Sequence, residues 1–574
     1  MPAHNADIAA IFDEIADLLE LARENPFRVR AYRRAAQVVR GQARELAEQL
    51  EDGLDPASLR GIGRDLAAKI REIVATGRCK ALVELRRRVP HGLEELLQLP
   101  GLGPARVRQI ESELGVKSPA GLRRAIREGR LRKLRGFGPK IEQKLGAALS
   151  APAGGQRTLR SVAAQYGRAL AARLARVRGV TRVEIAGSYR RGRETVGDLD
   201  LLVVSSAPKR AIEALAADEE VGEVLAAGTT RASVRLESGL QVDLRVVPEG
   251  SFGAALHYFT GSKAHNIRLR RLAQGRGLKV NEYGVFRGER QVGGATEESV
   301  FDSVGLPWIP PELREDGGEF EAARQGALPE LVARADLRGD LHVHTDATDG
   351  SAGLEAMARA ARAAGLDYIA ITDHSRHLGV YRGLDAGRLE RQVDEIDALP
   401  ERVKGLALLK GIEVDILEDG SLALPDRVLG KLDLVVGAVH GHFGLDRRRQ
   451  TKRLLRAIEH PHFSILAHPR GRLIGERGPM DFDVERVLEA CAARGCFVEL
   501  NSQPQRLDLD DAGCRLAAGR GVLVSIASDA HRPEDFGLLE GGVTQARRGW
   551  LGAKQVLNAR PLGELRKLLR RTMR

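Results

Sequence analysis

The stretch VEIAGSYRRGRETVGDLDLLVVSS (183–206) contains two apolar runs separated by a glycine-serine turn and a basic segment. This pattern predicts a strand, a turn and a second, buried strand. Because side chains alternate along a strand, Asp198 and Asp200 lie on one face and Leu199 on the other. A lone D-x-D is often only a solvated turn, but Asp243 lies in another alternating run, LQVDLRVV (240–247). Three carboxylates on strand faces indicate a cation site.

Such a set of carboxylates is suited to phosphoryl transfer. It can hold two Mg²⁺ or Mn²⁺ ions roughly 3.5–4 Å apart, one for the attacking hydroxyl and one for the leaving phosphates. The turn before the aspartates would supply donors to a triphosphate from Gly187 and Ser188, with Arg191 as a bidentate phosphate partner. The stretch therefore predicts nucleotidyl transfer.

Upstream, one turn occurs three times, as LRGIG (59–63), LPGLG (99–103) and LRGFG (134–138), each before a helical pattern. Paired glycines allow a tight turn that aims backbone N–H groups outward at a helix N-terminus, which forms an anion site. A single copy would usually be a plain helix-hairpin turn. Three copies in a basic region indicate binding of the nucleic-acid backbone. The six glycines concerned are Gly61, Gly63, Gly101, Gly103, Gly136 and Gly138.

Two other features of this region allow more than one interpretation. ENPFRVRAYRRAA (24–36) places Arg28, Tyr32 and Arg33 or Arg34 close together on a helix, either for binding a nucleic-acid backbone or as a solvated basic face. Lys69 follows the first glycine turn, and it could contact phosphate as a point charge. A lysine with a lowered pKa could instead attack an abasic sugar aldehyde as a Schiff-base nucleophile.

Charge and histidine divide the 574 residues into two halves. Residues 1–300 carry 51 basic and 36 acidic residues, whereas residues 301–574 carry 39 and 42. The basic half is the candidate for a polyanionic partner. The four cysteines form no C-x-x-C pair, and no signal pattern or membrane-length apolar run is present, so we expect a cytoplasmic protein with buried thiols.

Beyond residue 336, short apolar runs alternate with helical patterns about every 30 residues, which is the rhythm of a parallel β/α barrel. The runs are DLHVHT, YIAITDH, LLKGIEV, LDLVVGAVH, FSILAHP, CFVELNS and VLVSIASDAH. In such barrels the carboxyl ends of the strands meet on one face. Histidine is a common metal ligand and a poor core residue, so six histidines at strand ends predict a metal centre. The residues brought together are His342, His344, His374, Glu413, His440, His468, Asp529 and His531.

The N-terminal motifs resemble those of family X DNA polymerases over residues 1–316. GSYRRGRETVGDLD resembles the family's nucleotidyltransferase signature, HYFTGSKAHNIRLRRLAQGRGLKVNEYGVF (257–286) resembles its Y-F-T-G-S and N-E-Y segments, and the glycine turns resemble its helix-hairpin-helix elements. The resemblance implies that Asp198, Asp200 and Asp243 bind the catalytic metals. It also implies that Lys69 is the Schiff-base lysine and that Arg28 and Tyr32 line a 5′-phosphate pocket. The nucleotide contacts that it implies are Arg157, Gly187, Ser188, Arg191, Gly197, Tyr258, Phe259, Gly261, Lys263, Asn266 and Arg270.

Two positions depart from the animal repair members of that family. Asp65 stands where they have a second pocket lysine. We therefore expect weaker binding of a 5′-phosphate, and the sequence does not decide whether the chain has lyase activity. Lys263 stands where they carry an acidic residue.

The C-terminal motifs resemble the PHP (polymerase and histidinol phosphatase) domain. This resemblance adds Asp349, in TDATDGS, to the eight residues above and implies a site for up to three Zn²⁺ or Mn²⁺ ions. Asp373, Asp415, His377 and His442 also lie close in sequence, and we expect them behind these ligands or at the surface.

Together these features predict a multidomain chain of helical helix-hairpin-helix domains, an α+β palm and thumb, and a distorted β/α barrel. The expected boundaries are a lyase-like domain at 1–80, fingers at 81–148, a palm at 149–250, a thumb at 251–316, a linker at 317–336 and a PHP domain at 337–574.

The function implied is a gap-filling DNA polymerase acting on gapped or nicked DNA and dNTPs, with a metal-dependent 3′→5′ exonuclease that could also act at abasic sites or on 3′-phosphates. One alternative is a nucleotidyltransferase acting on RNA or a small molecule, fused to a phosphatase. Another is a non-catalytic DNA end-binding scaffold. Nothing in the sequence demands more than a monomer.

Lys263 gives the first test. If its charge draws the incoming nucleotide, Lys263→Ala weakens dNTP binding by roughly 2- to 5-fold, the range expected for one partly exposed charge pair. Titration of dNTP binding measures this, with Lys209→Ala, outside the motifs, as the control. Unchanged affinity in Lys263→Ala contradicts the assignment.

Overall fold

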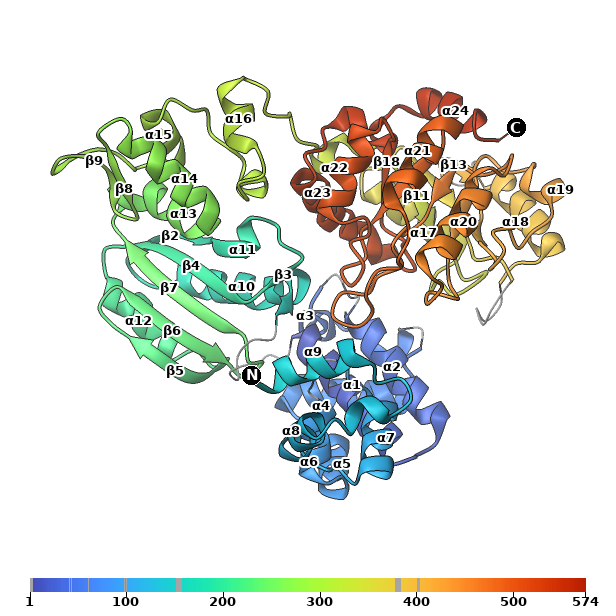
Figure 1. Cartoon of the computed structure of the whole chain (residues 1–574), viewed down its shortest axis with the longest axis horizontal. Helices are drawn as coiled ribbons and strands as arrows, with labels where there is room; N and C mark the ends of the chain where they lie inside the picture. The colour runs from blue at the N-terminus through green and yellow to red at the C-terminus, as the bar shows by residue number, and fades with distance from the viewer. Residues whose placement is uncertain are drawn as a thin grey trace. The chain divides into compact units, whose positions relative to one another are not determined.

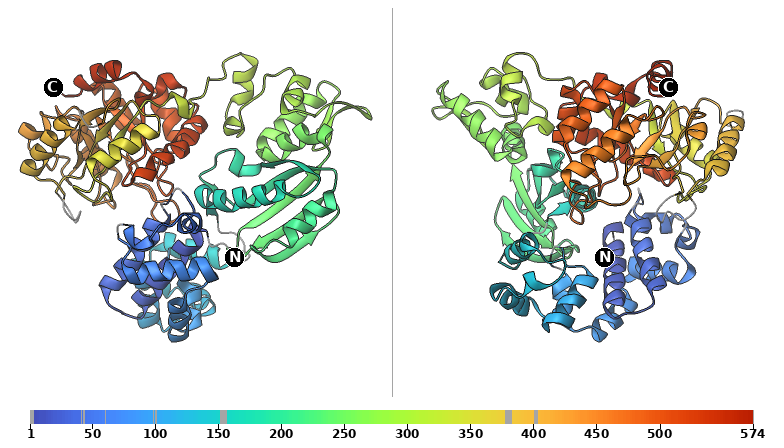
Figure 2. Two further views of the ribbon diagram at one scale, coloured as in Figure 1. Left: turned by 180° about the vertical axis from the view of Figure 1, so that it is seen from behind. Right: turned by 45° about the vertical axis from the view of Figure 1, so that its right-hand side comes forward.

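The computed structural model describes residues 4–573 except 41, 43, 60, 98, 100, 151–156, 377–382 and 400–402 (Figures 1 and 2). The chain divides into two compact units. One contains residues 1–158, 215–226 and 233–242, and the other contains the remainder. Among the described residues, no helix has the length and apolarity needed to cross a membrane.

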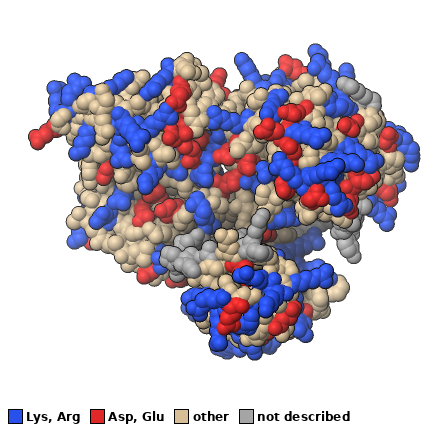
Figure 3. Space-filling view, in the orientation of Figure 1, with Lys and Arg blue, Asp and Glu red and all other residues tan. Residues whose placement is uncertain are grey.

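The N-terminal region is entirely helical in its described part. Its core is one cluster of buried apolar side chains that includes Phe12, Ile70 and Leu96. Lys and Arg side chains are numerous on its surface, at the bottom of Figure 3. The helices are α1 (Asn5–Leu21), α2 (Pro26–Arg40), α3 (Leu46–Glu51), α4 (Arg64–Thr76), α5 (Lys80–Arg88), α6 (His91–Leu97), α7 (Pro104–Leu114), α8 (Pro119–Arg127) and α9 (Pro139–Ser150).

The three glycine turns share one backbone conformation. The first glycine of each turn has a positive φ, at +94° in Gly61, +88° in Gly101 and +86° in Gly136. Residues with a Cβ rarely adopt such angles, so the repeated glycine has a steric reason. The second glycine directly precedes α4, α7 and α9. The prediction of three glycine turns that open helices is confirmed.

The palm is a five-stranded sheet in the order β2-β4-β7-β6-β5. β2 and β4 pair antiparallel, and β4 and β7 show the expected alternation, with Leu199, Val242 and Leu244 buried. Its elements are β1 (Thr158–Leu159), α10 (Arg160–Ala175), β2 (Val180–Ile185), α11 (Gly187–Arg190), β3 (Thr195–Val196), β4 (Asp198–Ser205), α12 (Pro208–Ala216), β5 (Val221–Ala227), β6 (Arg231–Leu236) and β7 (Gln241–Val247).

The thumb combines helices with a small antiparallel sheet, β10-β9-β8. Its elements are α13 (Phe252–Thr260), α14 (Lys263–Gln274), β8 (Lys279–Asn281), β9 (Gly284–Arg287), β10 (Arg290–Gly293) and α15 (Glu297–Ser303). The expected linker contains α16 (Glu319–Arg324), whose Phe320 is buried in the thumb's apolar cluster.

The C-terminal domain is a distorted barrel of parallel strands surrounded by helices (Figure 2). It consists of a three-stranded sheet, β11-β12-β13, and a five-stranded sheet, β14-β15-β16-β17-β18. Single bridges, Val343 to Ala530 and His374 to Glu413, connect the two sheets. The strands are β11 (Gly339–Val343), β12 (Tyr368–Ile371), β13 (Ala407–Lys410), β14 (Glu413–Asp415), β15 (Val436–Ala438), β16 (Ile465–Leu466), β17 (Phe497–Asn501) and β18 (Val524–Ala527).

The helices of this domain are α17 (Leu354–Ala363), α18 (Ala386–Ala398), α19 (Asp426–Leu429), α20 (Arg447–Ile458), α21 (Val484–Arg494), α22 (Asp511–Gly519), α23 (Leu539–Arg548) and α24 (Leu562–Arg570). The run LLKGIEV, expected as one strand, forms two. Gly411 donates its N–H to Ile371 O, and a Cβ there would lie 2.8 Å from Thr372 Cγ2. Strand β13 therefore ends before this close approach, and β14 begins in the other sheet.

His4 gives a test of the packing of the first unit. Its ring nitrogens lie 3.1 Å from Glu220 Oε1 and 3.5 Å from Glu45 Oε1. Burial lowers the pKa of His4, but hydrogen bonds and charge from the two glutamates outweigh that effect and raise the pKa to about 10.

A folded-state pKa above the unfolded value makes His4 stabilising below about pH 6.5, and this contribution is lost as the pH rises towards 10. We therefore expect His4→Gln to reduce the pH dependence of the unfolding free energy between pH 7 and pH 10, measured by urea denaturation. The control is His91→Gln, because His91 is 83% exposed. If wild type and His4→Gln lose equal stability over this range, the interpretation is wrong.

Candidate metal and nucleotide sites

Three carboxylates converge on the palm sheet. Asp198 and Asp200 open β4, and Asp243 lies on the neighbouring strand β7. Burial raises the pKa of Asp200, and the charges of Asp198 and Asp243 raise it further, to about 7. Mutual repulsion of this kind is relieved when a cation lies between the groups. The three aspartates therefore fit a divalent metal site.

The backbone turn before these aspartates passes close to the carboxylate of Asp200 at Gly187. Gly187 has a φ of +62°, and a Cβ at this position would lie 2.3 Å from Asp200 Oδ2. Only glycine fits so close to the carboxylate. Ser188 Oγ is shielded from solvent and makes no hydrogen bond to any described residue, which leaves a donor for a ligand.

The other predicted nucleotide residues lie in the palm turn and the thumb. Arg191 donates to Thr260 O (2.5 Å) and Glu315 Oε1 (3.1 Å), so a triphosphate would have to compete with these partners. The rings of Tyr258 and Phe259 pack edge to face, 5.1 Å apart.

On α14, Asn266 Nδ2 donates to Tyr258 O (2.7 Å), and Arg270 Nε donates to Asn266 O (3.3 Å). Gly261 ends α13 with a φ of +65°, while Lys263 and Arg157 are exposed and Gly197 is half-buried. The nucleotide-contact roles of these residues stay predictions.

Lys69 lies near Tyr32 in the helical domain. Its Nζ donates to Asp65 Oδ1 at 2.5 Å, and its side chain is 16% exposed. Burial lowers the pKa of Lys69, but its hydrogen bond to Asp65 and the charge of Tyr32 outweigh this effect and raise that pKa. The Tyr32 ring is buried against Phe12, whereas Arg28 is exposed beside Glu24. This geometry favours a charged lysine that contacts phosphate over a neutral nucleophile.

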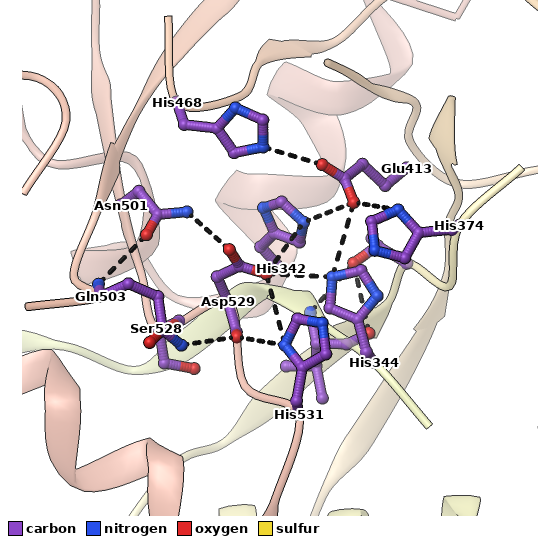
Figure 4. Close-up of polar contacts among 12 residues, drawn as sticks. His342, His344, His374, Glu413, His468, Asn501, Gln503, Ser528, Asp529 and His531 are labelled. Atoms are coloured by element: carbon purple, nitrogen blue, oxygen red, sulfur yellow. Dashed lines mark hydrogen bonds and ion pairs between the residues drawn. The ribbon is translucent and has the colours of Figure 1, made fainter. Parts of the chain in front are cut away.

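The predicted ligands of the C-terminal domain meet at the carboxyl ends of the barrel strands (Figure 4). Three groups each place their ligand atoms within 4.8 Å of one another. The groups are His344, Asp349, His374 and His531; His342, His344 and Asp529; and His374, Glu413 and His440. His468 joins them through Glu413, with Nε2 2.9 Å from Oε1. All nine predicted residues are therefore brought together.

Several ligand atoms of this centre are shielded from solvent and make no well-directed hydrogen bond among the described residues. They include His342 Nε2, both ring nitrogens of His344, His374 Nδ1, His468 Nδ1 and Glu413 Oε2. Some of them face one another at ion-pair distance, as His374 Nδ1 and Glu413 Oε2 do at 2.7 Å. Buried polar atoms are ordinarily hydrogen-bonded, and imidazole and carboxylate groups are ligands of Zn²⁺ and Mn²⁺. Asp349 is 40% exposed, which leaves the centre open on one side. The residues fit a metal cluster that substrate can reach.

The pKa values of the centre show how strongly its groups depend on opposite charge. Burial raises the pKa of the Glu413 carboxyl, but the charges of His374, His440 and His342 outweigh this and hold it well below its usual range. Burial lowers the pKa of His440, whereas the charge of Glu413 raises it, to about 9. A bound cation would replace these protons.

Outer residues fix the orientation of the ligands, and sequence reasoning missed two of them. Glu499 Oε1 lies 2.6 Å from His342 Nδ1, and Asn501 Nδ2 donates to Asp529 Oδ2 (3.0 Å). Both are polar residues inside the apolar run CFVELNS, and that signal could have identified them. Asp415 was expected behind the ligands, and its Oδ1 lies 2.9 Å from His440 Nδ1. Such partners orient metal-bound histidines.

The other residues that the sequence led us to expect behind the ligands or at the surface are Asp373, His442 and His377. Asp373 accepts hydrogen bonds from the backbone and hydroxyl of Thr345 and from Gln392. His442 is 45% exposed and lies near Glu418. His377 lies outside the described residues.

Family comparisons agree with this architecture. Residues 157–244 match the DNA polymerase beta palm and 255–315 the DNA polymerase beta thumb. Residues 3–79 match a helix-hairpin-helix domain, 93–151 a SAM-like helix-hairpin-helix tandem and 340–503 the PHP domain. The fold is thus that of a family X polymerase core joined to a PHP domain.

Similarity to one relative extends over nearly the whole chain. The DNA polymerase/3′-5′ exonuclease PolX of Bacillus subtilis is 39% identical over 99% of this chain and all of its own length. The chain belongs to the PolX family. A probable phosphatase of Caldanaerobacter subterraneus is 33% identical over 34% of this chain and 78% of its own length. A probable phosphatase of Thermoanaerobacter sp. is 29% identical over 41% of this chain and 95% of its own length.

Asp65 gives the test of the lysine site. Asp65→Asn removes the main group that raises the pKa of Lys69 and leaves burial, which lowers it. Because a neutral amine is the nucleophile, we expect a several-fold increase in borohydride trapping of the chain on abasic DNA. Lys69→Ala should abolish trapping, and Asp52→Asn, at another exposed ion pair, is the matched control. If trapping is equal in Asp65→Asn and wild type, Asp65 does not suppress the reaction.

Proposed function

We propose that this chain is a DNA polymerase with a 3′→5′ exonuclease, which extends DNA ends at the palm and trims them at the PHP centre. The observation that supports it is the presence of two separate sets of metal-ligating side chains in one chain, on a palm sheet and on a parallel barrel. The three glycine turns supply sites for the DNA backbone. Filling of short gaps during repair is the role that best fits this combination.

At the palm, Asp198, Asp200 and Asp243 would hold two Mg²⁺ or Mn²⁺ ions. When bound, these ions neutralise the triphosphate and lower the pKa of the primer 3′-hydroxyl. Ser188 and the backbone at Gly187 donate to the triphosphate, so that the leaving pyrophosphate is held in line with the attacking oxygen. Tyr258 and Phe259, near the end of α13 before Gly261, would lie beside the sugar of the incoming dNTP.

At the barrel, the nine ligands would hold up to three Zn²⁺ or Mn²⁺ ions, which generate a nucleophile from water and bind the scissile phosphate. Glu499, Asn501 and Asp415 fix the rings and carboxylates in place. The exposed edge at Asp349 admits a phosphodiester at a DNA 3′ end. Abasic sites and 3′-phosphates are further phosphoesters that this centre could take. A monomer is sufficient, because both sites are formed by one chain.

Two substitutions test this proposal on a labelled gapped duplex with Mg²⁺ or Mn²⁺. Asp198→Ala should abolish extension and retain degradation. His344→Ala should retain extension and reduce degradation by more than the roughly 10- to 100-fold typical of losing an outer partner of a metal ligand.

A wild-type chain that binds the duplex without extending or degrading it would indicate a scaffold. Extension of RNA or of a small acceptor in place of DNA would indicate the other nucleotidyltransferases. If both activities survive both substitutions, the assignment of the two sites is wrong.

A further inference from the structure

The loop that carries the predicted triphosphate contacts is held by the PHP domain. This loop, residues 187–198, contains Ser188 and Arg191 and ends at Asp198. We call it the palm loop. Its contacts with the PHP domain lie at residues 191–194. They begin at Arg191, a predicted triphosphate contact, and end shortly before Asp198, the first metal-binding aspartate.

Glu194 is the most strongly held residue of the palm loop. Arg472 donates to it twice, from Nη1 to Oε2 (3.2 Å) and from Nη2 to Oε1 (2.5 Å). Gln545 Nε2 also donates to Oε1 (2.7 Å). The Arg472 side chain is 12% exposed and Gln545 is 1% exposed. A bidentate pair with a third donor, shielded from water, fixes both the position and the orientation of a carboxylate.

Helix α23 contacts the loop at two further points. Arg548 Nη1 donates to Arg191 O (2.8 Å), and its side chain is 3% exposed. Gly192 has a φ of +69°, and a Cβ there would lie 2.4 Å from Thr544 Cγ2. Thr544 and Arg548 are four residues apart and so lie on one face of α23. The loop backbone therefore packs directly on this helix.

Glu194 is also connected to the catalytic strand. Its carbonyl accepts a hydrogen bond from Arg160 N (2.9 Å), and it directly precedes β3. Asp198 is the fourth residue after it. On the other side of the contact, Arg472 is four residues from the metal ligand His468. One ion pair thus connects short segments that lead into both candidate sites.

We propose that Arg472 and Gln545 of the PHP domain are positioning residues for the polymerase reaction, which act by holding Glu194 and with it the palm loop. Arg548 and the Gly192–Thr544 contact support the same loop. This inference depends on the polymerase activity proposed above.

The test compares steady-state kinetics of single-nucleotide insertion in full-length variants. Arg472→Gln and Gln545→Leu should each raise the KM for dNTP by about 10- to 100-fold, the size expected for loss of a hydrogen bond to a charged phosphate. We expect kcat to change less than KM, because the metal-binding aspartates remain. Gln545→Leu should retain wild-type exonuclease activity, which shows that the chain is folded.

The matched control is Arg547→Ala. Arg547 is also on α23 and also crosses to the polymerase region, where its Nε donates to Glu312 Oε1 (2.7 Å), but it does not contact the palm loop in the described structure. It should leave the KM for dNTP unchanged. Exchange of the pair, Glu194→Arg with Arg472→Glu, should reverse most of the increase in KM caused by Arg472→Glu alone.

The possible outcomes separate the two proposals. If wild type does not extend DNA, the proposed function fails. If wild type extends DNA and the KM for dNTP is the same in Arg472→Gln, Gln545→Leu and Arg547→Ala, the positioning role is overturned. If the exchanged pair shows no recovery over Arg472→Glu, the Glu194–Arg472 contact does not carry the effect.

Discussion

Metal-ligating side chains crowded together at the ends of strands are the constraint on which both candidate sites depend. In the palm, three carboxylates share one region of a sheet, and burial together with the charges of Asp198 and Asp243 raises the pKa of Asp200 to about 7. In the barrel, six histidines and three carboxylates share a space in which several ring nitrogens have no hydrogen bond among the described residues. Neither arrangement is favourable in a metal-free interior, because burial of uncompensated charge or unpaired polar atoms costs several kcal/mol. Divalent cations remove both costs, so the folds around them can be understood as scaffolds for metal.

The two scaffolds meet this constraint in different ways. The palm places Asp198 and Asp200 by the two-residue repeat of one strand and adds Asp243 from the neighbouring strand. The barrel instead takes single residues from the carboxyl ends of many strands, where the backbone diverges and side chains point into the open end. Two of the three palm carboxylates are therefore set by one short segment, whereas the barrel site requires the whole domain to fold.

This difference explains what could be predicted from the sequence. The alternation in GDLDLLVV and the repeated glycine turns are local, so they indicated the aspartates and the helix N-termini directly. Histidines at successive strand ends indicated the barrel ligands because parallel strands have only one carboxyl edge. Glu499 and Asn501 were missed because their partners, His342 and Asp529, are 157 and 28 residues away and no local pattern joins them. The division of LLKGIEV into two strands could not be predicted, because it depends on the tertiary contact at Gly411. The Glu194–Arg472 pair could not be predicted either, because it spans 278 residues.

The contacts of individual arginines give part of the chain's arginine excess a structural explanation. Arginine outnumbers lysine 75 to 15, a ratio that genome composition alone could produce. At the palm loop, however, arginine makes contacts that lysine could not reproduce. Arg472 donates to both oxygens of Glu194, while Arg548 donates through one nitrogen to Arg191 O and Glu315 and through the other to Asp511. A planar fork of five donors can bridge several acceptors in a fixed geometry, whereas an ammonium group acts as a point charge. At these positions the fork allows a metal hydrolase of slightly negative charge to hold a loop of the basic polymerase.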